Sequence, residues 1–493
     1  MERYLIGVDI GTTGTKSMLV SESGRVVAHA YAGYEMRTPS NGRCEQDAED
    51  WWRAVVKTVR AVASEPRYAK NVVALSLSLQ GGTLVPVDAK GEALQPAIVW
   101  SDKRCKDQRA AFAARFGEDY LYQRSGWKLS AGLNAMQIAW IRDNRPDIFE
   151  KTAMFLSVPD YISLRMTGRA VVDISDVGIN QLADIRSGAY DEGILDFCGI
   201  SERALAEIQP SATPIGRLLP LAAAELGLPR NVLLVAGAHD QYASLLGAGI
   251  TRAGDMLIGT GTAWVVTALC DAPDFASGFS QSVPAVGGWG SMVSLSAGGV
   301  CLDWFRNNIA SSEEEGGLPY SIINEMAAQR RIGASGLMFY PYFNGSYFPV
   351  LAPEGKATLV GLDFSHDRYD IARAIMEGIA MQTAWVLEYF RAKYPIRKLK
   401  LSGGASKSAL WTQMVTDIAN YPVTTPNMSD LACVGAAVMA GVGSGVFASC
   451  EEGIARVVVE ENEYLPDPAR AERYAEHFRE YKRRAALLPQ FYR

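Results

Sequence analysis

The first 87 residues alternate short apolar stretches with polar turns, and one longer stretch in between has a helical period. Residues Tyr4–Val8, Ser17–Val20 and Val26–Ala32 are typical of strands. Within Asp47–Ala63, apolar side chains recur every three or four positions, which predicts an amphipathic helix with Asp47 as its N-cap. Residues Val72–Leu79 predict a further strand. The order strand, strand, strand, helix, strand indicates an α/β unit.

The same pattern begins again after residue 246. Asp255–Ile258 predicts a short strand, Gly259–Thr262 a turn and Ala263–Leu269 the next strand. A Gly/Thr turn between two strands also occurs at Gly11–Thr15. One such turn is common, but both open an α/β pattern, which favours an internal duplication. We therefore expect an α/β fold of two similar lobes, each with a Gly/Thr hairpin facing a shared cleft.

The boundary between these lobes is expected where Gly247, Gly249 and Gly254 cluster. The sequence has no low-complexity linker there, so the hinge is expected to be short. The predicted domains are residues 1–246 and residues 247–493.

Composition excludes several classes of protein. Lys and Arg total 48 and Asp and Glu total 54, so the net charge of −6 does not supply the basic face of a nucleic-acid-binding protein. Seven cysteines without a C-x-x-C pair are typical of reduced thiols. No run of 18 apolar residues and no apolar leader occurs, so we expect a cytoplasmic protein without a membrane span.

The first Gly/Thr turn is a candidate phosphate site. Its backbone N–H groups and the hydroxyls of Thr12 and Thr13 can bind phosphate oxygens, with Gly14 in the turn and Lys16 supplying positive charge. Asp9, at the end of the preceding strand, can hold a magnesium ion through water. An ordinary β-hairpin would contain the same residue types.

Two later segments offer similar donors. Gly259, Thr260, Gly261 and Thr262 form the second turn, and a Gly-rich loop follows a strand predicted at Lys398–Leu401. Gly403, Gly404 and Ala405 in that loop would let a flat ring approach the backbone closely. The alternative is a routine strand-to-helix connection, leading to a helix at Ala409–Ala419.

Asp240 is the candidate catalytic acid. It follows an apolar strand at Val232–Ala236, and open α/β sheets place ligand groups just beyond the carboxyl ends of their strands. A carboxylate there can accept the proton of a substrate hydroxyl that attacks phosphorus. A helix N-cap is the alternative for Asp240, and we interpret His239 as a buried structural residue.

A polyol site is expected after the strand at Val72–Leu79. Gln80, Gly81 and Gly82 follow that strand, and Trp100 lies beside Asp102 and Arg104 in a later segment. An indole offers an apolar face to C–H groups, while charged side chains bind hydroxyls. Trp100 could equally belong to the core.

These motifs resemble the FGGY carbohydrate kinases, and within that family the chain looks most like the xylulokinase branch. The resemblance extends over nearly the whole chain and rests on Ile6–Gly14, Glu45–Asp47, Trp51-Trp52, Pro96–Trp100, Asp102, Arg104, Asp160-Tyr161, Leu164–Gly168, Gly237–Gln241, Gly259–Thr262, Ser402–Ala405 and the downstream signature Ala357, Leu359, Gly361, Leu362, Asp370, Ile371, Ala374–Glu377.

The resemblance implies a ribonuclease-H-like, actin-like fold in two lobes with ATP in the cleft. It also implies magnesium and phosphorylation of a hydroxyl on a small sugar or polyol. Asp240 matches the family's general base, Asp9 and Asp240 are the candidate magnesium residues, and Gln241 joins the substrate residues. The oligomeric state is left open, with a homodimer as the candidate.

The chain also departs from the xylulokinase pattern. Gln80-Gly81-Gly82-Thr83 stands where xylulokinases have Gln-Met-His-Gly, and Asp240-Gln241 replaces Asp-Asn. We expect the two glycines to open the sugar site and to disfavour D-xylulose as the physiological substrate.

Two rival functions use the same fold. An actin-like or chaperone-like ATPase acting on a protein partner would keep the hairpins, but the insert between residues 80 and 230, with Trp100, Asp102 and Asp160, favours a sugar pocket. A catalytically silent sugar-binding regulator is disfavoured because Asp9, Asp240 and the three loops are all retained.

Overall fold

A computed structural model describes residues 2–39, 42–295, 297–310, 317–428, 430–457 and 461–492. The chain forms two compact units. The first contains residues 1–252, 270–291 and 430–458, and the second contains residues 253–269, 292–429 and 459–493. The first unit thus extends past the predicted boundary at residue 246. It also includes two segments from later in the chain, whereas the predicted domains were two continuous ranges.

The first unit is built on a mixed sheet with the strand order β13-β14-β5-β1-β2-β3. Strand β1 pairs antiparallel with β2 and parallel with β5, and β14 pairs parallel with β5. The predicted strands and the helix capped by Asp47 are confirmed. These elements are β1 (Tyr4–Ile10), β2 (Gly14–Ser21), β3 (Val26–Gly33), α1 (Ala48–Val62), β5 (Val72–Leu79), β13 (Pro214–Arg217), β14 (Leu233–His239) and α11 (Asp240–Gly247).

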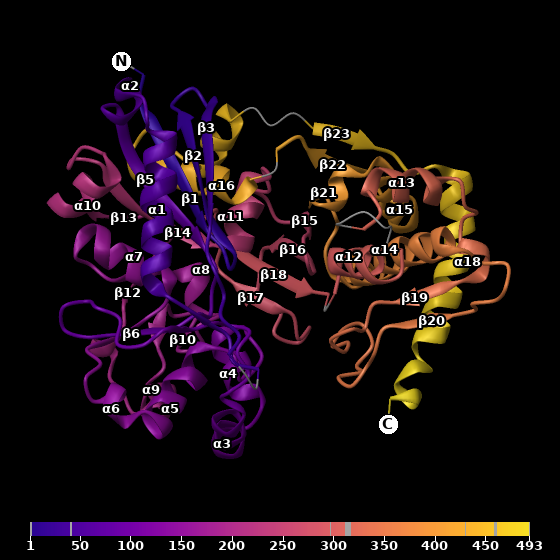
Figure 1. The fold of residues 1–493 in the computed structure, drawn as a ribbon, viewed down its shortest axis with the longest axis horizontal. Helices are drawn as coiled ribbons and strands as arrows, with labels where there is room; N and C mark the ends of the chain where they lie inside the picture. The colour runs from indigo at the N-terminus through magenta and orange to yellow at the C-terminus, as the bar shows by residue number, and fades with distance from the viewer. Residues whose placement is uncertain are drawn as a thin grey trace. The chain divides into compact units, whose positions relative to one another are not determined.

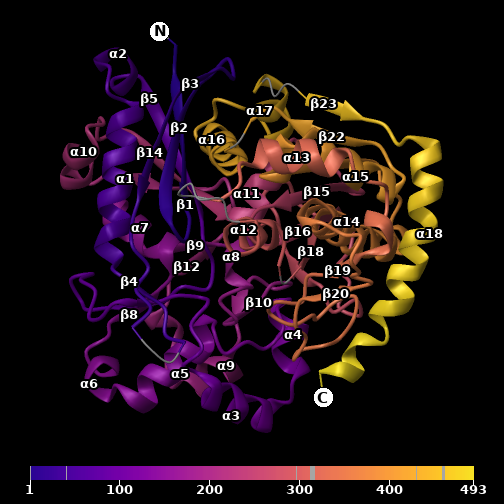
Figure 2. The ribbon, with the colours of Figure 1, turned by 45° about the vertical axis from the view of Figure 1, so that its right-hand side comes forward.

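Helices α1 and α16 (Leu431–Gly443) cover opposite faces of this sheet, and α16 comes from a distant part of the sequence (Figure 1). Ser17 of β2 donates to Thr58 of α1. Gly7 of β1 faces α16, where an added Cβ would lie only 1.9 Å from the carbonyl oxygen of Cys433. Gly435 of α16 packs in the same way against the Ala243 backbone of α11, and Figure 2 shows α11 and α16 side by side. Glycines therefore allow α16 to pack directly on backbone.

The rest of the first unit extends from the sheet through short elements. Some of these elements surround a second hydrophobic cluster that includes Phe112, Ile138 and Phe197. The elements are β4 (Glu45–Gln46), α2 (Pro66–Ala69), β6 (Val85–Val87), β7 (Ala97–Ile98), α3 (Lys106–Phe116), α4 (Asp119–Ser125), α5 (Asn134–Asn144), α6 (Pro146–Phe149), β8 (Met154–Leu156), α7 (Val158–Thr167), β9 (Val171–Asp173), α8 (Ile174–Val177), β10 (Ala183–Asp184), β11 (Ala189–Tyr190), α9 (Glu192–Cys198), β12 (Glu207–Gln209), α10 (Pro220–Leu226), β17 (Ser280–Ser282) and α17 (Cys450–Arg456).

The second unit repeats the central topology of the first. Its sheet contains the run β16-β15-β21-β22-β23, in which β15 pairs antiparallel with β16 and parallel with β21. The elements are β15 (Asp255–Thr260), β16 (Trp264–Cys270), β18 (Trp289–Ser294), α12 (Gly299–Asn308), α13 (Tyr320–Ala328), β19 (Met338–Tyr340), β20 (Thr358–Val360), α14 (Arg368–Lys393), β21 (Lys398–Gly403), α15 (Ala409–Ala419), β22 (Val423–Pro426), β23 (Glu461–Tyr464) and α18 (Pro468–Ala485). The matching strand order supports the predicted duplication.

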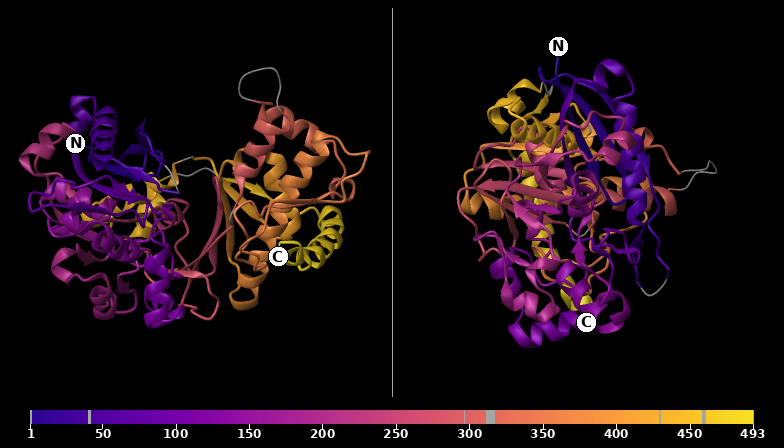
Figure 3. Two further views of the ribbon diagram at one scale, coloured as in Figure 1. Left: turned by 60° about the horizontal axis from the view of Figure 1, so that its bottom comes forward. Right: turned by 90° about the vertical axis from the view of Figure 1, so that its left-hand side faces the viewer.

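A buried polar contact ties α14 to α18 in this unit. Arg373 donates to Glu377 one helical turn later, at 2.8 Å, and Tyr474 of α18 donates to the same carboxylate at 2.8 Å. All three side chains are buried. Figure 3 shows α18, in yellow, alongside the orange helices. The contact satisfies a charge that would otherwise be costly to bury.

None of the described helices is long and apolar enough to span a membrane. The seven cysteines are free thiols, six of them buried.

Candidate active site

Asp9 lies at the carboxyl end of β1 and Asp240 directly follows β14, and these two parallel strands flank β5 in the first unit. Asp9 of β1 is opposite Ser78 of β5, and His239, which precedes Asp240, is opposite Leu79 on the other side of β5. Because these strands run in the same direction, their carboxyl ends meet at one edge of the sheet. The predicted acid and the predicted magnesium residue are therefore brought to the same edge.

The two carboxylates affect each other electrostatically. Burial first, and then the charge of Asp240, raise the pKa of Asp9 to about 6, although Ser78 donates to Asp9 Oδ1 at 2.8 Å and opposes the shift. The Asp240 side chain is 35% exposed. Two negatively charged carboxylates that lie close together favour a bound cation, because the cation offsets their repulsion.

Asp240 does not cap α11, which was the alternative for it. It is the first residue of the helix, and His239 occupies the N-cap position without a side-chain capping bond. His239 is buried, as predicted, and burial lowers its pKa. Its Nδ1 lies 3.4 Å from Asp240 Oδ1, so a neutral imidazole packs against the candidate base.

The first Gly/Thr turn is positioned by side chains of the same unit. Trp100 Nε1 donates to Thr12 Oγ1 at 3.3 Å, and Gln46 Nε2 donates to the Thr12 carbonyl at 2.6 Å. Thr13 is exposed, whereas Gly14 already belongs to β2. Lys16, the predicted source of positive charge, makes an ion pair with Asp430 at 2.9 Å.

Trp100 is 47% exposed, so the core alternative is wrong. Its contact with Thr12 joins the predicted polyol site to the predicted phosphate turn.

The charged residues near Trp100 in the sequence, Asp102 and Arg104, bond to each other instead. Arg104 donates to both oxygens of Asp102, at 2.9 and 2.8 Å. Asp160 caps α7 by accepting from the Ser157 backbone. The carboxylates of Asp102 and Asp160 thus already have hydrogen-bond donors within the protein, Arg104 and Ser157 respectively.

The prediction that Gly81 and Gly82 open the sugar site is wrong. A Cβ at Gly81 would lie within 3 Å of side-chain atoms of Ile179, Asp176 and His239. At Gly82 the φ angle is +73° and a Cβ would lie 2.5 Å from Leu133. Neighbouring side chains already fill the space, so the glycines allow close packing and a tight turn.

Asp176 is a polar residue of this region that the sequence analysis missed. It is fully buried, and neither carboxyl oxygen has a hydrogen-bond partner among the described residues. Burial first, and then neighbouring carboxylates including Asp240, raise its pKa well above the usual value. In the sequence, Asp176 is marked only by the two closely spaced acids of Asp173-Ile174-Ser175-Asp176. This is a weak signal for a functional residue. In the structure, Asp176 lies in the short helix α8, which follows β9.

Gln80 and Gln241 are the remaining predicted substrate residues. Gln80 is buried, and its Nε2 donates to Gln46 Oε1 at 3.0 Å while its Oε1 has no partner among the described residues. Gln241 follows Asp240 in the first turn of α11 and is partly exposed. Gln80 follows β5 and Gln241 lies at the start of α11, which follows β14, so both are near the sheet edge at which Asp9 lies.

In the second unit, the hairpin turn and the Gly-rich loop form one structure. Thr260 Oγ1 donates to the Ser402 carbonyl at 2.6 Å and accepts from the Ala405 backbone at 3.0 Å, and Gly404 N donates to the Thr260 carbonyl at 2.8 Å. Gly403 has a φ of +98° beside Thr260. The two predicted loops are thereby fixed to each other. Gly261, Thr262, Gly403 and Gly404 are exposed, whereas Gly259 is partly exposed and Thr260 and Ala405 are buried.

The residues present suit a water-mediated magnesium ion better than a fully protein-coordinated one. No group of three or more His, Cys, Asp or Glu side chains within the described ranges could hold a metal. Magnesium usually keeps several waters and binds one or two carboxylates together with phosphate oxygens. Asp9 and Asp240 fit this donor set.

Comparisons with known proteins identify the family of the chain. Residues 4–247 match the N-terminal domain, and residues 256–444 the C-terminal domain, of the FGGY family of carbohydrate kinases. A xylulose kinase from Bacillus subtilis (strain 168) is 30% identical, with 97% of this chain and 96% of that protein covered. A gluconokinase from the same strain is 27% identical, over 90% of this chain and 88% of that protein. The structure of a xylulose kinase from Rhodospirillum rubrum matches with a TM-score of 0.90 and 27% identity, over 99% of this chain and 100% of that chain.

Proposed function

The chain belongs to the FGGY family of carbohydrate kinases, and on this premise we propose that Asp240 is the general base for transfer of the γ-phosphoryl group of ATP to a hydroxyl of a small ketose or polyol. Family membership makes the chain an ATP-dependent sugar kinase with the actin-like ATPase fold. The alternative ATPase that acts on a protein is not supported. The observation that carries the assignment of Asp240 is its place beside Asp9 at the carboxyl edge of the first sheet.

Asp240 suits proton abstraction because its side chain is partly exposed and has no cation partner among the described residues. An acceptor hydroxyl that donates to this carboxylate becomes more nucleophilic as its proton moves to the carboxylate oxygen. The imidazole of His239, whose pKa is lowered by burial, lies 3.4 Å from the carboxylate and therefore leaves it without a cationic partner there.

In the first unit, Thr12, Thr13 and Gly14 offer backbone and hydroxyl donors that suit phosphate oxygens of ATP. In the second unit, Gly261 and Thr262 offer donors of the same kind. The loop at Gly403–Ala405 would accommodate the adenosine. Asp9 and Asp240 would hold magnesium through water, and the ion would neutralise charge on the phosphates. The pairing of Lys16 with Asp430 makes this lysine a weaker phosphate ligand than the sequence suggests.

The acceptor is a small sugar or polyol that lies against Trp100. The exposed indole offers an apolar face to C–H groups. The side-chain amide of Gln241 and the Oε1 of Gln80, which is unpaired among the described residues, offer hydrogen bonds to hydroxyls. Relatives named for both xylulose and gluconate favour a linear or open-chain acceptor.

Replacing Asp240 tests the assignment. Asp240→Asn should lower kcat by about 10²- to 10⁴-fold because general-base assistance is lost. The melting temperature, and the affinity for ATP measured without magnesium, should stay near the wild-type values, since the amide has the same shape. The acceptor is first identified by a screen of pentuloses, hexuloses, sugar acids and polyols with coupled detection of ADP. A kcat within about threefold of wild type would rule out Asp240 as the base.

A further inference from the structure

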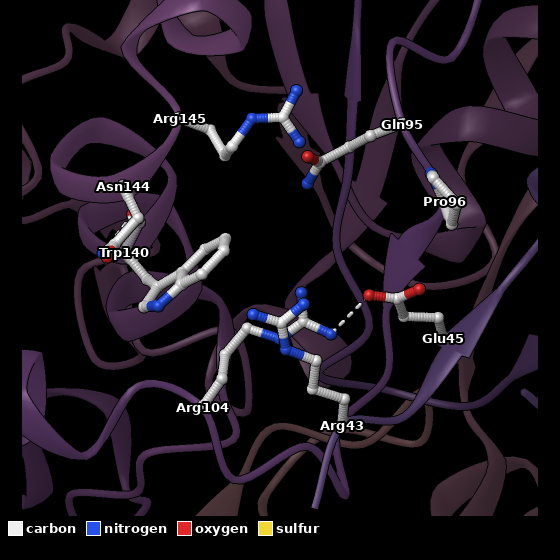
Figure 4. Close-up of a pocket in the computed structure, with 8 residues that line it drawn as sticks. All are labelled: Arg43, Glu45, Gln95, Pro96, Arg104, Trp140, Asn144 and Arg145. Atoms are coloured by element: carbon white, nitrogen blue, oxygen red, sulfur yellow. Dashed lines mark hydrogen bonds and ion pairs between the residues drawn. The ribbon is translucent and has the colours of Figure 1, made fainter. Parts of the chain in front are cut away.

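A pocket of about 370 Å³ lies in the first unit among residues that the proposed reaction does not use. Figure 4 shows its lining side chains arranged around a central hollow. Its volume is within the range of small-molecule sites. The lining residues are Arg43, Glu45, Gln95, Pro96, Arg104, Trp140, Asn144 and Arg145.

Two of the three arginines rest on the same aromatic ring. The guanidinium carbon of Arg43 lies 5.9 Å, and that of Arg104 lies 5.1 Å, from the centre of the Trp140 ring. A cation over an indole face is attracted by the ring's electrons, and the contact restricts a long side chain. Arg43 is exposed and makes no ion pair or hydrogen bond with any other described side chain. Its donors are therefore available to a ligand.

Carboxylates hold Arg104 through two of its three guanidinium nitrogens and leave the third, Nη1, for a ligand. Its Nε and Nη2 donate to Asp102, and Nη2 also donates to Glu45 at 2.7 Å. The Arg104 side chain is only 7% exposed. Within the described chain its Nη1 has no hydrogen-bond acceptor.

Arg145 is held in the same manner from the other side of the hollow. Its Nε and Nη2 donate to Asp147, at 3.1 and 3.0 Å, and its Nη1 has no acceptor among the described residues. In Figure 4, Arg145 approaches the hollow from the side opposite Arg43 and Arg104. Three guanidinium groups with unused N–H donors therefore surround one space, and the carboxylates that hold Arg104 and Arg145 reduce the entropy these two side chains lose on binding a ligand.

We propose that this pocket binds a small phosphate monoester that also carries hydroxyl groups. Guanidinium groups bind phosphate oxygens through paired, charge-assisted hydrogen bonds. The side-chain amides of Gln95 and Asn144 and the second carboxyl oxygen of Glu45 can bond hydroxyls.

The carboxylates that anchor the arginines limit the charge of the ligand. The three carboxylates of Asp102, Glu45 and Asp147 together balance the positive charges of Arg104, Arg145 and Arg43, the last of which is unpaired among the described residues. A single phosphate is therefore a better match than a polyphosphate. Because Glu45 and Arg104 are not part of the proposed catalytic machinery, this site does not depend on the assignment of Asp240.

Titration calorimetry at constant ionic strength tests the proposal. Glycerol 3-phosphate and inorganic phosphate should bind saturably to the full-length protein, the ester more tightly, and Arg43→Ala should not alter any binding of glycerol, which lacks the phosphate. Arg43→Ala should weaken binding of the ester about tenfold, as expected when one charged hydrogen-bonding group is removed. Because Arg43 is exposed, its substitution should leave the melting temperature unchanged.

Arg67→Ala provides a matched control. Arg67 is also exposed and also lies over an aromatic ring, 4.7 Å from the centre of Tyr68, but it is outside the pocket. Its substitution should leave the affinity for glycerol 3-phosphate unchanged. Arg145→Gln is a second test from the opposite wall and should weaken binding by a similar factor. Absence of saturable binding up to about 20 mM, or binding that survives both Arg43→Ala and Arg145→Gln, would overturn the proposal.

Discussion

Gly82 occupies a backbone conformation and a packing position that both disfavour a side chain. Its φ is +73°, and an added Cβ would lie 2.5 Å from Leu133. Gly82→Ala should therefore lower the free energy of unfolding by about 1–3 kcal/mol. Thermal denaturation measures this, and kcat/KM for different acceptors should change in parallel rather than selectively.

Gly445→Ala separates the two causes of that loss. Gly445 has nearly the same φ, +72°, but no atom lies within 4 Å of the position that a Cβ would take. Its substitution should cost only the backbone strain. If Gly82→Ala were no more destabilising than Gly445→Ala, packing against Leu133 would have no role.

Asp160 is a buried carboxyl whose titration should affect stability. Burial raises its pKa from 3.8 to about 6, although Ser157 opposes the shift through hydrogen bonds. The folded protein thus keeps a proton that the unfolded chain releases, so this stabilising contribution is complete below pH about 4 and is lost as the pH rises through about 6.

Asp160→Asn should remove this dependence while keeping the cap of α7, because an amide can still accept from the Ser157 backbone and donate to its hydroxyl. Between pH 5 and pH 8, the wild type should lose about 1–2 kcal/mol more stability than the variant. Urea denaturation at both pH values measures the difference. Equal losses in the two proteins would show that Asp160 does not titrate in this range.

At the scale of elements, the contact between β1 and α16 depends on the absence of a side chain at Gly7. An added Cβ would lie 1.9 Å from the Cys433 carbonyl oxygen and 2.7 Å from the Ala437 nitrogen. Neither backbone atom can move without shifting α16, whose residues from Leu431 to Gly441 are all buried.

Gly7→Ala should therefore destabilise the first unit by about 3 kcal/mol or more, at the upper end of overpacking effects. Gly216→Ala, in β13 of the same sheet, is the control, since its nearest neighbour would be 3.5 Å away. Melting temperatures compare the two. A similar small decrease for both would mean that α16 adjusts easily to the added methyl group.

At the scale of the whole molecule, the first unit is assembled from separate parts of the chain. Helix α16 covers β1 but is encoded after most of the second unit. A fragment of residues 1–252 should therefore expose the apolar face of its sheet and lack a cooperative thermal transition. Circular dichroism and dye binding measure this.

A linked chain that adds residues 430–457 to that fragment should regain part of the transition, because it restores α16. Cooperative unfolding of residues 1–252 alone would instead support an independent N-terminal domain close to the predicted residues 1–246. The predicted homodimer, cytoplasmic location and magnesium requirement stay predictions at this scale.

Local patterns determined much of the protein. The periodicity of the strands and of α1, the Gly/Thr hairpins and the helix at Ala409–Ala419 are short-range features, and the structure has each of them. The family motifs extend along the chain, so the sugar kinase could be identified without coordinates. The position of Asp240 after an apolar strand also indicated the sheet edge at which it lies.

Only the tertiary structure decided features that depend on contacts between distant residues. The space at Gly81 is filled by Ile179, Asp176 and His239, which no local pattern around residue 81 reveals. Arg43, Arg104 and Arg145 meet at one pocket because a strand end, a loop and the end of α5 converge there. The side of the sheet that α16 covers likewise follows from glycine-to-backbone packing. Periodicity reports which residues of one element share a face, whereas the partner of that face is set by packing across the fold.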